Sequence, residues 1–126
     1  MDHKFQIMDM QGVLYYKDIP LVDFKIFHTK LIYARDLSKG SYYPCEMFLL
    51  GLTYEAFCAF FNERVVREHA QWVWDYLHQM GLGHYDFEEL IKKMNGWDAT
   101  GFHWVKFPDM GAKCWEDIVR QKYPIY

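Results

Sequence analysis

The first third of the chain alternates apolar and polar positions in short runs, which is the pattern of β-strands. Residues 13–16 form one β-prone run, and residues 22–26 form another in which apolar and charged side chains alternate. Because the turn-forming residues 17–20 separate these runs, the pattern predicts a β-hairpin. A third strand is expected at 31–33, and a loop is expected from 36 to 44.

In the middle of the chain the apolar positions change to the helical period. Thr53, whose hydroxyl suits a helix N-cap, precedes a run of apolar residues at that period. These residues are Phe57, Phe60, Phe61 and Val65. We therefore predict a helix from about 53 to 65 that buries an aromatic face.

Two further helices are predicted in the second half of the chain. The first has three apolar residues on one stripe, Val73, Leu77 and Met80. Gly81 follows them and suits a left-handed C-cap. The second begins at Asp86, with Glu89 placed to complete a capping box, and ends at Asn95 and Gly96. Helices this short and this closely connected are expected to pack against one another.

The chain returns to a β-prone pattern near its end. Residues 102–107 lie between Gly101 and Pro108 and predict one strand, and residues 112–121 predict a last helix. The expected fold class is α+β, with a single domain over residues 1–126. A small antiparallel sheet, built from the N-terminal hairpin and the late strand, is packed by three to four short helices.

Composition narrows the classes of function. The chain has 126 residues, of which 52% are hydrophobic and 20% aromatic, so global disorder is excluded. Fourteen basic residues are interspersed with seventeen acidic ones, so we expect no direct nucleic-acid binding. No apolar run approaches the length of a membrane span, and no apolar segment follows the N-terminus. The cysteines, Cys45, Cys58 and Cys114, have no C-x-x-C spacing, which favours reduced thiols in the cytoplasm.

No catalytic or metal-binding pattern emerges from the polar residues. His69 and His78 are nine positions apart on a predicted helix and so lie on roughly opposite faces, which argues against a metal site. His78, His84 and His103 are interpreted as surface or half-buried rings. A triad of Cys58, His69 and Asp75 is conceivable, but no nucleophile motif surrounds the thiol, and core packing is the favoured role of Cys58. Phosphate-binding glycine motifs are absent. We therefore predict no enzyme activity, no catalytic residues, no metal and no cofactor.

The segment from 64 to 74 combines arginines with tryptophans. Arg64 and Arg67 precede Trp72 and Trp74, and these residue types dominate binding hot spots. Two helical residues two positions apart lie about 200° apart around the axis, so both indoles cannot face one core. One interpretation is a solvated face with local ion pairs. The other, which we adopt as the candidate partner-binding site, is a docking patch of Arg64, Arg67, Trp72 and Trp74.

The order of motifs along the chain resembles a known family. A hairpin with a Lys-Asp turn, a Phe-Phe helix, a helix ending in Gly81 and Leu82, and a segment starting at Tyr85 occur in that order. Asn95, Gly96 and Gly101 then precede a strand. This arrangement over residues 11–107 resembles the N-terminal subdomain of HipA-type serine/threonine kinase toxins.

The resemblance implies a function without catalysis. In that family the kinase body follows this subdomain, so we expect no kinase activity from this chain. Split systems of the family contain a free-standing N-terminal subdomain that acts as an antitoxin. The resemblance therefore implies a cytoplasmic protein-binding regulator that inhibits a toxin kinase. The alternative is a small inhibitor of a host defence nuclease, similar to an anti-CRISPR protein encoded by a mobile element.

Overall fold

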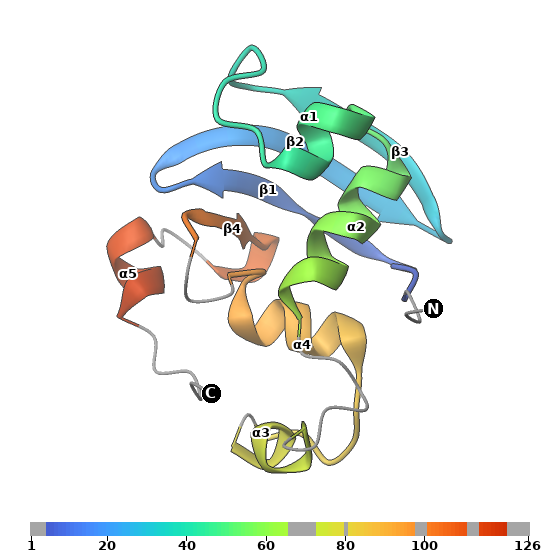
Figure 1. Ribbon diagram of the computed structural model, residues 1–126, viewed down its shortest axis with the longest axis vertical. Coiled ribbons are helices and arrows are strands. Elements are labelled where there is room, and N and C mark those ends of the chain that lie inside the picture. The colour runs from blue at the N-terminus through green and yellow to red at the C-terminus, as the bar shows by residue number, and fades with distance from the viewer. Residues whose placement is uncertain (1–4, 66–72, 80, 98–100, 111–113, 121–126) are drawn as a thin grey trace.

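A four-stranded antiparallel sheet forms one layer of the protein, in the order β3-β2-β1-β4 (Figure 1). The computed structural model describes residues 5–65, 73–79, 81–97, 101–110 and 114–120. The strands are β1 (Met10–Tyr16), β2 (Ile19–Phe27), β3 (Lys30–Asp36) and β4 (His103–Lys106). The helices are α1 (Cys45–Leu50), α2 (Tyr54–Arg64), α3 (Val73–Gln79), α4 (Phe87–Met94) and α5 (Trp115–Val119), with a 3-10 turn η1 (Pro108–Met110). The α+β class with a small antiparallel sheet is therefore confirmed.

The main core lies between one face of the sheet and α2. The predicted aromatic stripe of α2 is buried there, and the ring centroids of Phe57 and Phe24 are 4.4 Å apart. The helix begins where the sequence predicts, because the Thr53 hydroxyl accepts a hydrogen bond from the Ala56 amide at 3.1 Å. Its last turn ends at Arg64, one residue before the predicted end.

A second, smaller cluster forms on the other face of the sheet, since successive side chains of a strand point in opposite directions. Trp104 of β4 is fully buried with Ile118 of α5, and its ring stacks on Tyr15 at 4.8 Å. The Trp104 indole N–H donates to the carbonyl of Lys17 at 2.7 Å. Helix α5 thus covers the β1–β4 end of this face (Figure 1).

The end of α4 is tied directly to β4. Asn95 caps the helix in a left-handed conformation, as the Asn-Gly pair predicts. Its carbonyl accepts from the Val105 amide at 2.7 Å, and its side-chain amide donates to the Val105 carbonyl at 3.3 Å. A Cβ atom on Gly96 would lie 2.9 Å from the Phe61 ring, so glycine permits this close approach of α4 to α2.

Most predicted elements occur, with changes at their ends. The hairpin turn contains only Lys17 and Asp18 rather than residues 17–20, because the register of β2 shifts by one residue and admits Pro20 opposite Tyr15. The third strand is longer than predicted, covering Lys30–Asp36. Of the predicted helix at 112–121, the structure has Trp115–Val119, while 111–113 and 121 lie outside the described residues.

One helix was not predicted. Residues 45–50 form α1, which begins after Pro44 and ends at Gly51 with a φ of 74°. Six residues are too few to display the helical period, so the apolar residues within 45–50 do not indicate a helix or which of its sides is buried.

Candidate functional site

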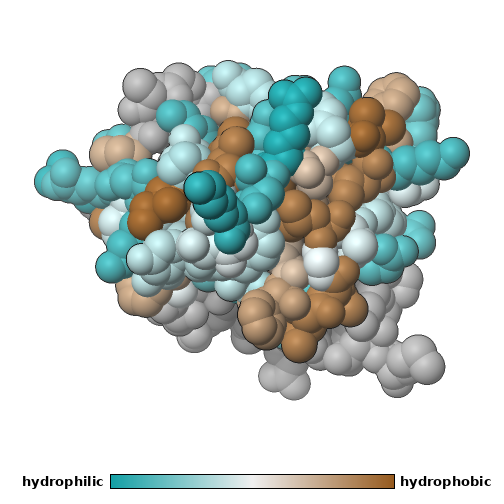
Figure 2. All heavy atoms as spheres, turned by 90° about the horizontal axis from the view of Figure 1, so that it is seen from above, coloured by the Kyte–Doolittle hydropathy of each residue, from teal (hydrophilic) through white to brown (hydrophobic). Residues whose placement is uncertain are grey.

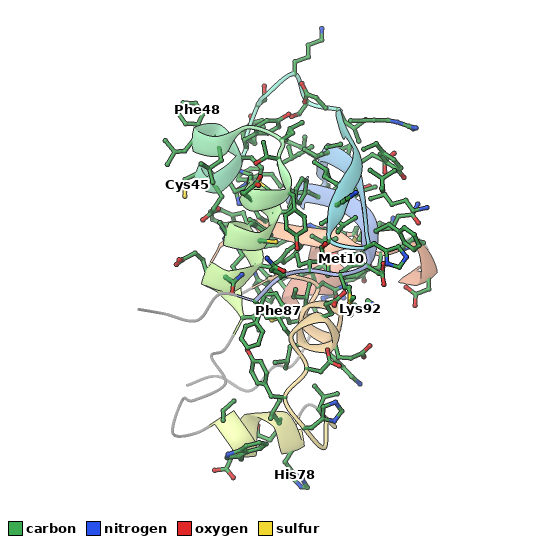
Figure 3. All side chains as sticks on the ribbon, turned by 90° about the vertical axis from the view of Figure 1, so that its right-hand side faces the viewer. Met10, Cys45, Phe48, His78, Phe87 and Lys92 are labelled. Atoms are coloured by element: carbon green, nitrogen blue, oxygen red, sulfur yellow. The ribbon has the colours of Figure 1, made fainter. Side chains whose placement is uncertain are left out.

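The most exposed apolar surface that the structure describes lies on α1. The exposed fractions of Phe48, Leu49 and Leu50 are 78%, 75% and 51%. Phe48 points away from the body of the protein (Figure 3). Seen from above, the end of the molecule that carries α1 shows apolar side chains grouped between polar ones (Figure 2). We call Phe48, Leu49 and Leu50 the α1 patch.

The geometry of α1 explains why this patch is exposed. Each residue advances by about 100° around a helix, so three consecutive side chains cannot all face one core. Met47, which is 1% exposed, is the side chain that α1 buries. The patch therefore stands outside the core, as contiguous apolar surface at a binding site commonly does.

Contacts with α2 hold α1 in place. The Arg64 guanidinium lies 3.4 Å from the Glu46 carboxylate, and their side chains are only 17% and 12% exposed. The same guanidinium donates to the Phe60 carbonyl at 2.9 Å and lies 3.8 Å from the centroid of the Phe60 ring. These contacts fix the angle between α1 and α2, so the patch is presented on a rigid support.

The predicted docking patch of Arg64, Arg67, Trp72 and Trp74 is only partly described. Arg64 contacts α1 rather than α3. Trp74 is 62% exposed on α3, which lies at the other end of the molecule from α1 (Figure 1). Trp74 therefore does not face the core, in keeping with the helical spacing that keeps the two indoles from sharing one buried face. Arg67, Trp72 and His69 lie outside the described residues.

The loop before α1 is organised by Asp36. One carboxylate oxygen of Asp36 accepts from the amides of Ser38 and Gly40 at 3.1 and 3.2 Å. A hydrogen bond from the Tyr43 hydroxyl is the largest cause that lowers the pKa of Asp36. Burial, and then the bond to Asp36, raise the pKa of Tyr43 to about 12. This network sets the path of the chain from β3 into α1.

Aromatic contacts hold the other side of that loop. The ring of Tyr42 stacks on Tyr16 at 4.7 Å, and its carbonyl lies 2.7 Å from Nε2 of His103. Tyr16 also meets the edge of Phe102 at 5.7 Å. No sequence pattern predicts this arrangement, since residues 16, 42 and 102 are distant in sequence and meet only in the folded chain.

The surroundings of Cys45 do not activate its thiol as a nucleophile. A hydrogen bond to the Glu46 carboxylate is the main cause that raises the pKa of Cys45, which keeps this exposed thiol protonated. Cys58 is half-buried against the main core, as predicted, and all three cysteines are free. Asp75 is exposed on α3, whereas Cys58 lies on α2 and packs against the main core.

The histidines lie where the sequence analysis placed them. His78 and His84 are exposed, and His103 is half-buried. Among the residues that the structure describes, no three His, Cys, Asp or Glu side chains gather as a metal site would require. Within the same residues, every helix is too short or too polar to cross a membrane. Comparison of the chain with protein-family models, curated proteins and solved structures finds no match.

Proposed function

We propose that this chain is a protein-binding regulator without catalytic activity, and that its partner docks on the α1 patch. The observation that carries the proposal is the exposure of Phe48, Leu49 and Leu50 on a helix whose opposite side is anchored by Met47. A rigid apolar anchor of this kind loses little conformational entropy when it is buried by a partner.

The energetics are consistent with a binding hot spot. Burying one Phe or Leu side chain contributes about 1.5–3 kcal/mol. Truncation of a central anchor typically costs about 2–4 kcal/mol of binding free energy. Because Phe48 and Leu49 make few contacts within the chain, replacing them leaves the fold intact and removes their contribution to binding alone.

The resemblance to HipA-type N-terminal subdomains supplies the partner class. Under this proposal the chain binds a toxin kinase in the cytoplasm and inhibits it, as a detached antitoxin-like subdomain would. A defence nuclease is the alternative partner, and the same binding experiment distinguishes the two.

The test is affinity purification of the tagged chain from its native host, with mass spectrometry to identify the captured protein and a kinase or nuclease assay of that protein with and without the chain. We expect the double variant Phe48→Ser with Leu49→Ser to lose capture and inhibition. Ile32→Ser is the matched control, because Ile32 is 54% exposed on β3, outside the patch.

Three outcomes contradict parts of the proposal. Unchanged capture by the folded double variant would exclude the α1 patch. Loss of capture on changing Arg67 and Trp74 to Ala, with the α1 variants unaffected, would assign binding to the predicted segment at 64–74 instead. Capture of a nuclease, with inhibition of its cleavage, would replace the kinase by the alternative partner.

A further inference from the structure

A groove lies between the sheet and α4, apart from the α1 patch. It has a volume of about 690 Å³ and is walled by the first residues of β1, the last residues of β2, the last turn of α4 and the turn η1. Met10 of β1 and Lys92 of α4 both line it (Figure 3). The groove uses none of the residues assigned above to the α1 patch or to its support.

The charges of the lining are mixed, with a positive excess. Lys25, Lys92 and Lys93 contribute ammonium groups, whereas Asp9 and Asp109 contribute carboxylates. Asp9 is already engaged, because its Oδ1 accepts from the His28 amide at 3.1 Å. Within the part of the chain that the structure describes, Lys25 and Lys92 form no ion pair.

A second hollow adjoins the groove on the sheet. A shallower hollow of about 190 Å³ shares Gln11, Phe107 and Pro108 with the groove and is also lined by Lys106. Asp23 lies at its far side, where Arg35 is 3.7 Å from its carboxylate. The two hollows together form a track that suits an extended segment rather than a compact ligand.

The walls also offer apolar contact. Phe27 is 48% exposed at one side of the groove, and Phe107 lies in its lining. A ligand that fits these walls carries negative charge next to an apolar side chain. Carboxylates that meet two uncommitted ammonium groups gain charge-assisted hydrogen bonds.

We propose that this groove binds an acidic segment of the protein partner, with an apolar residue of that segment against Phe27. The inference deepens the proposed function and rests on it only in that the partner is a protein. A peptide suits this mixed lining better than a nucleic acid, because a peptide can place carboxylates at Lys25 and Lys92 and uncharged residues opposite Asp9 and Asp109, whereas a nucleic acid carries a phosphate at every nucleotide.

The test uses the full chain and a fluorescent synthetic peptide in which Asp and Glu flank one Phe. Binding is measured by fluorescence anisotropy at low and high salt. We expect Lys25→Glu and Lys92→Glu each to weaken binding, and the double variant to weaken it by about tenfold or more. Lys39→Glu is the matched control, because it makes the same charge change on an exposed lysine in the 37–44 loop, outside the groove.

The outcomes separate the groove from the α1 patch. No binding of the acidic peptide to the wild-type chain, or equal binding by the folded double variant, would overturn the inference. Tighter binding of a single-stranded oligonucleotide than of the peptide would overturn it in favour of a nucleic-acid surface. The Phe48→Ser, Leu49→Ser variant should bind the acidic peptide as tightly as the wild type. Peptide binding in the groove is therefore tested independently of partner binding at the α1 patch.

Discussion

The Arg64 guanidinium is paired with the Glu46 carboxylate at 3.4 Å, and this pair joins the end of α2 to α1. Both side chains are largely withdrawn from water, and the guanidinium also covers the Phe60 ring. Arg64 therefore holds α1 in position on α2, and under the proposed function it would act on binding through that position.

This relationship predicts the effect of Arg64→Ala. Loss of the ion pair, the bond to the Phe60 carbonyl and the ring contact should lower the free energy of unfolding by about 2 kcal/mol. Urea denaturation measures the change. Arg35→Ala is the control: the Arg35 side chain is 69% exposed, so loss of its pair with Asp23 and of its contact with the Tyr33 ring should cost less than about 1 kcal/mol. Equal effects of the two substitutions would contradict a special role for Arg64.

A second prediction compares two phenylalanines. Phe61 is fully buried and touches Gly96, so Phe61→Ala should cost about 3–5 kcal/mol of stability. Phe48→Ala should change stability by less than about 0.5 kcal/mol, since Phe48 is 78% exposed. Chemical-denaturation midpoints give both values, and a Phe61→Ala midpoint equal to that of the wild type would refute the assigned core.

A third prediction concerns the link between α4 and β4. Asn95→Ala should destabilise the protein by about 2 kcal/mol, because it removes the bond to the Val105 carbonyl and places alanine at a φ of 56°. Asn95→Gly also loses the side-chain bond to Val105 but relieves the backbone strain. Thermal unfolding should therefore rank the alanine variant below the glycine variant, and the reverse order would show that backbone strain is not involved.

A fourth prediction follows from the lowered pKa of Asp36. Since its folded pKa lies below the usual value of 3.8, the group stabilises the fold above that value, and this contribution is lost as the pH falls through the folded pKa. Carboxyl NMR titration should show the lowered value. Tyr43→Phe removes the largest cause and should move the pKa of Asp36 upward, and an unchanged titration would exclude the bond from Tyr43.

A fifth prediction concerns metals and disulfides. The three cysteines are free, and stability should therefore not depend on oxidation. EDTA and a thiol reductant should each leave the melting temperature unchanged. A fall of more than about 4 °C, which corresponds to about 1 kcal/mol in a domain of this size, would reveal a stabilising metal or disulfide.

Local sequence determined the elements that have an apolar residue period or a capping residue at their ends. The aromatic stripe of α2, its Thr53 cap, the Asp86 cap of α4 and the Asn95 end of that helix all follow from neighbouring residues. Each depends on backbone preference or on one short hydrogen bond, and such interactions do not require the rest of the chain.

Tertiary structure alone decided which of these side chains remain exposed to solvent and which distant residues they contact. The sequence predicts Arg64 as part of a docking patch but gives no sign of its ion pair with Glu46, eighteen positions away, which forms only when α1 packs on α2. The exposure of Phe48, the groove that brings Lys25 beside Lys92, and the pairing of Asn95 with Val105 also depend on how distant elements meet. Exposure is set by what covers a residue, and a local pattern does not contain that information when the covering element is distant in sequence.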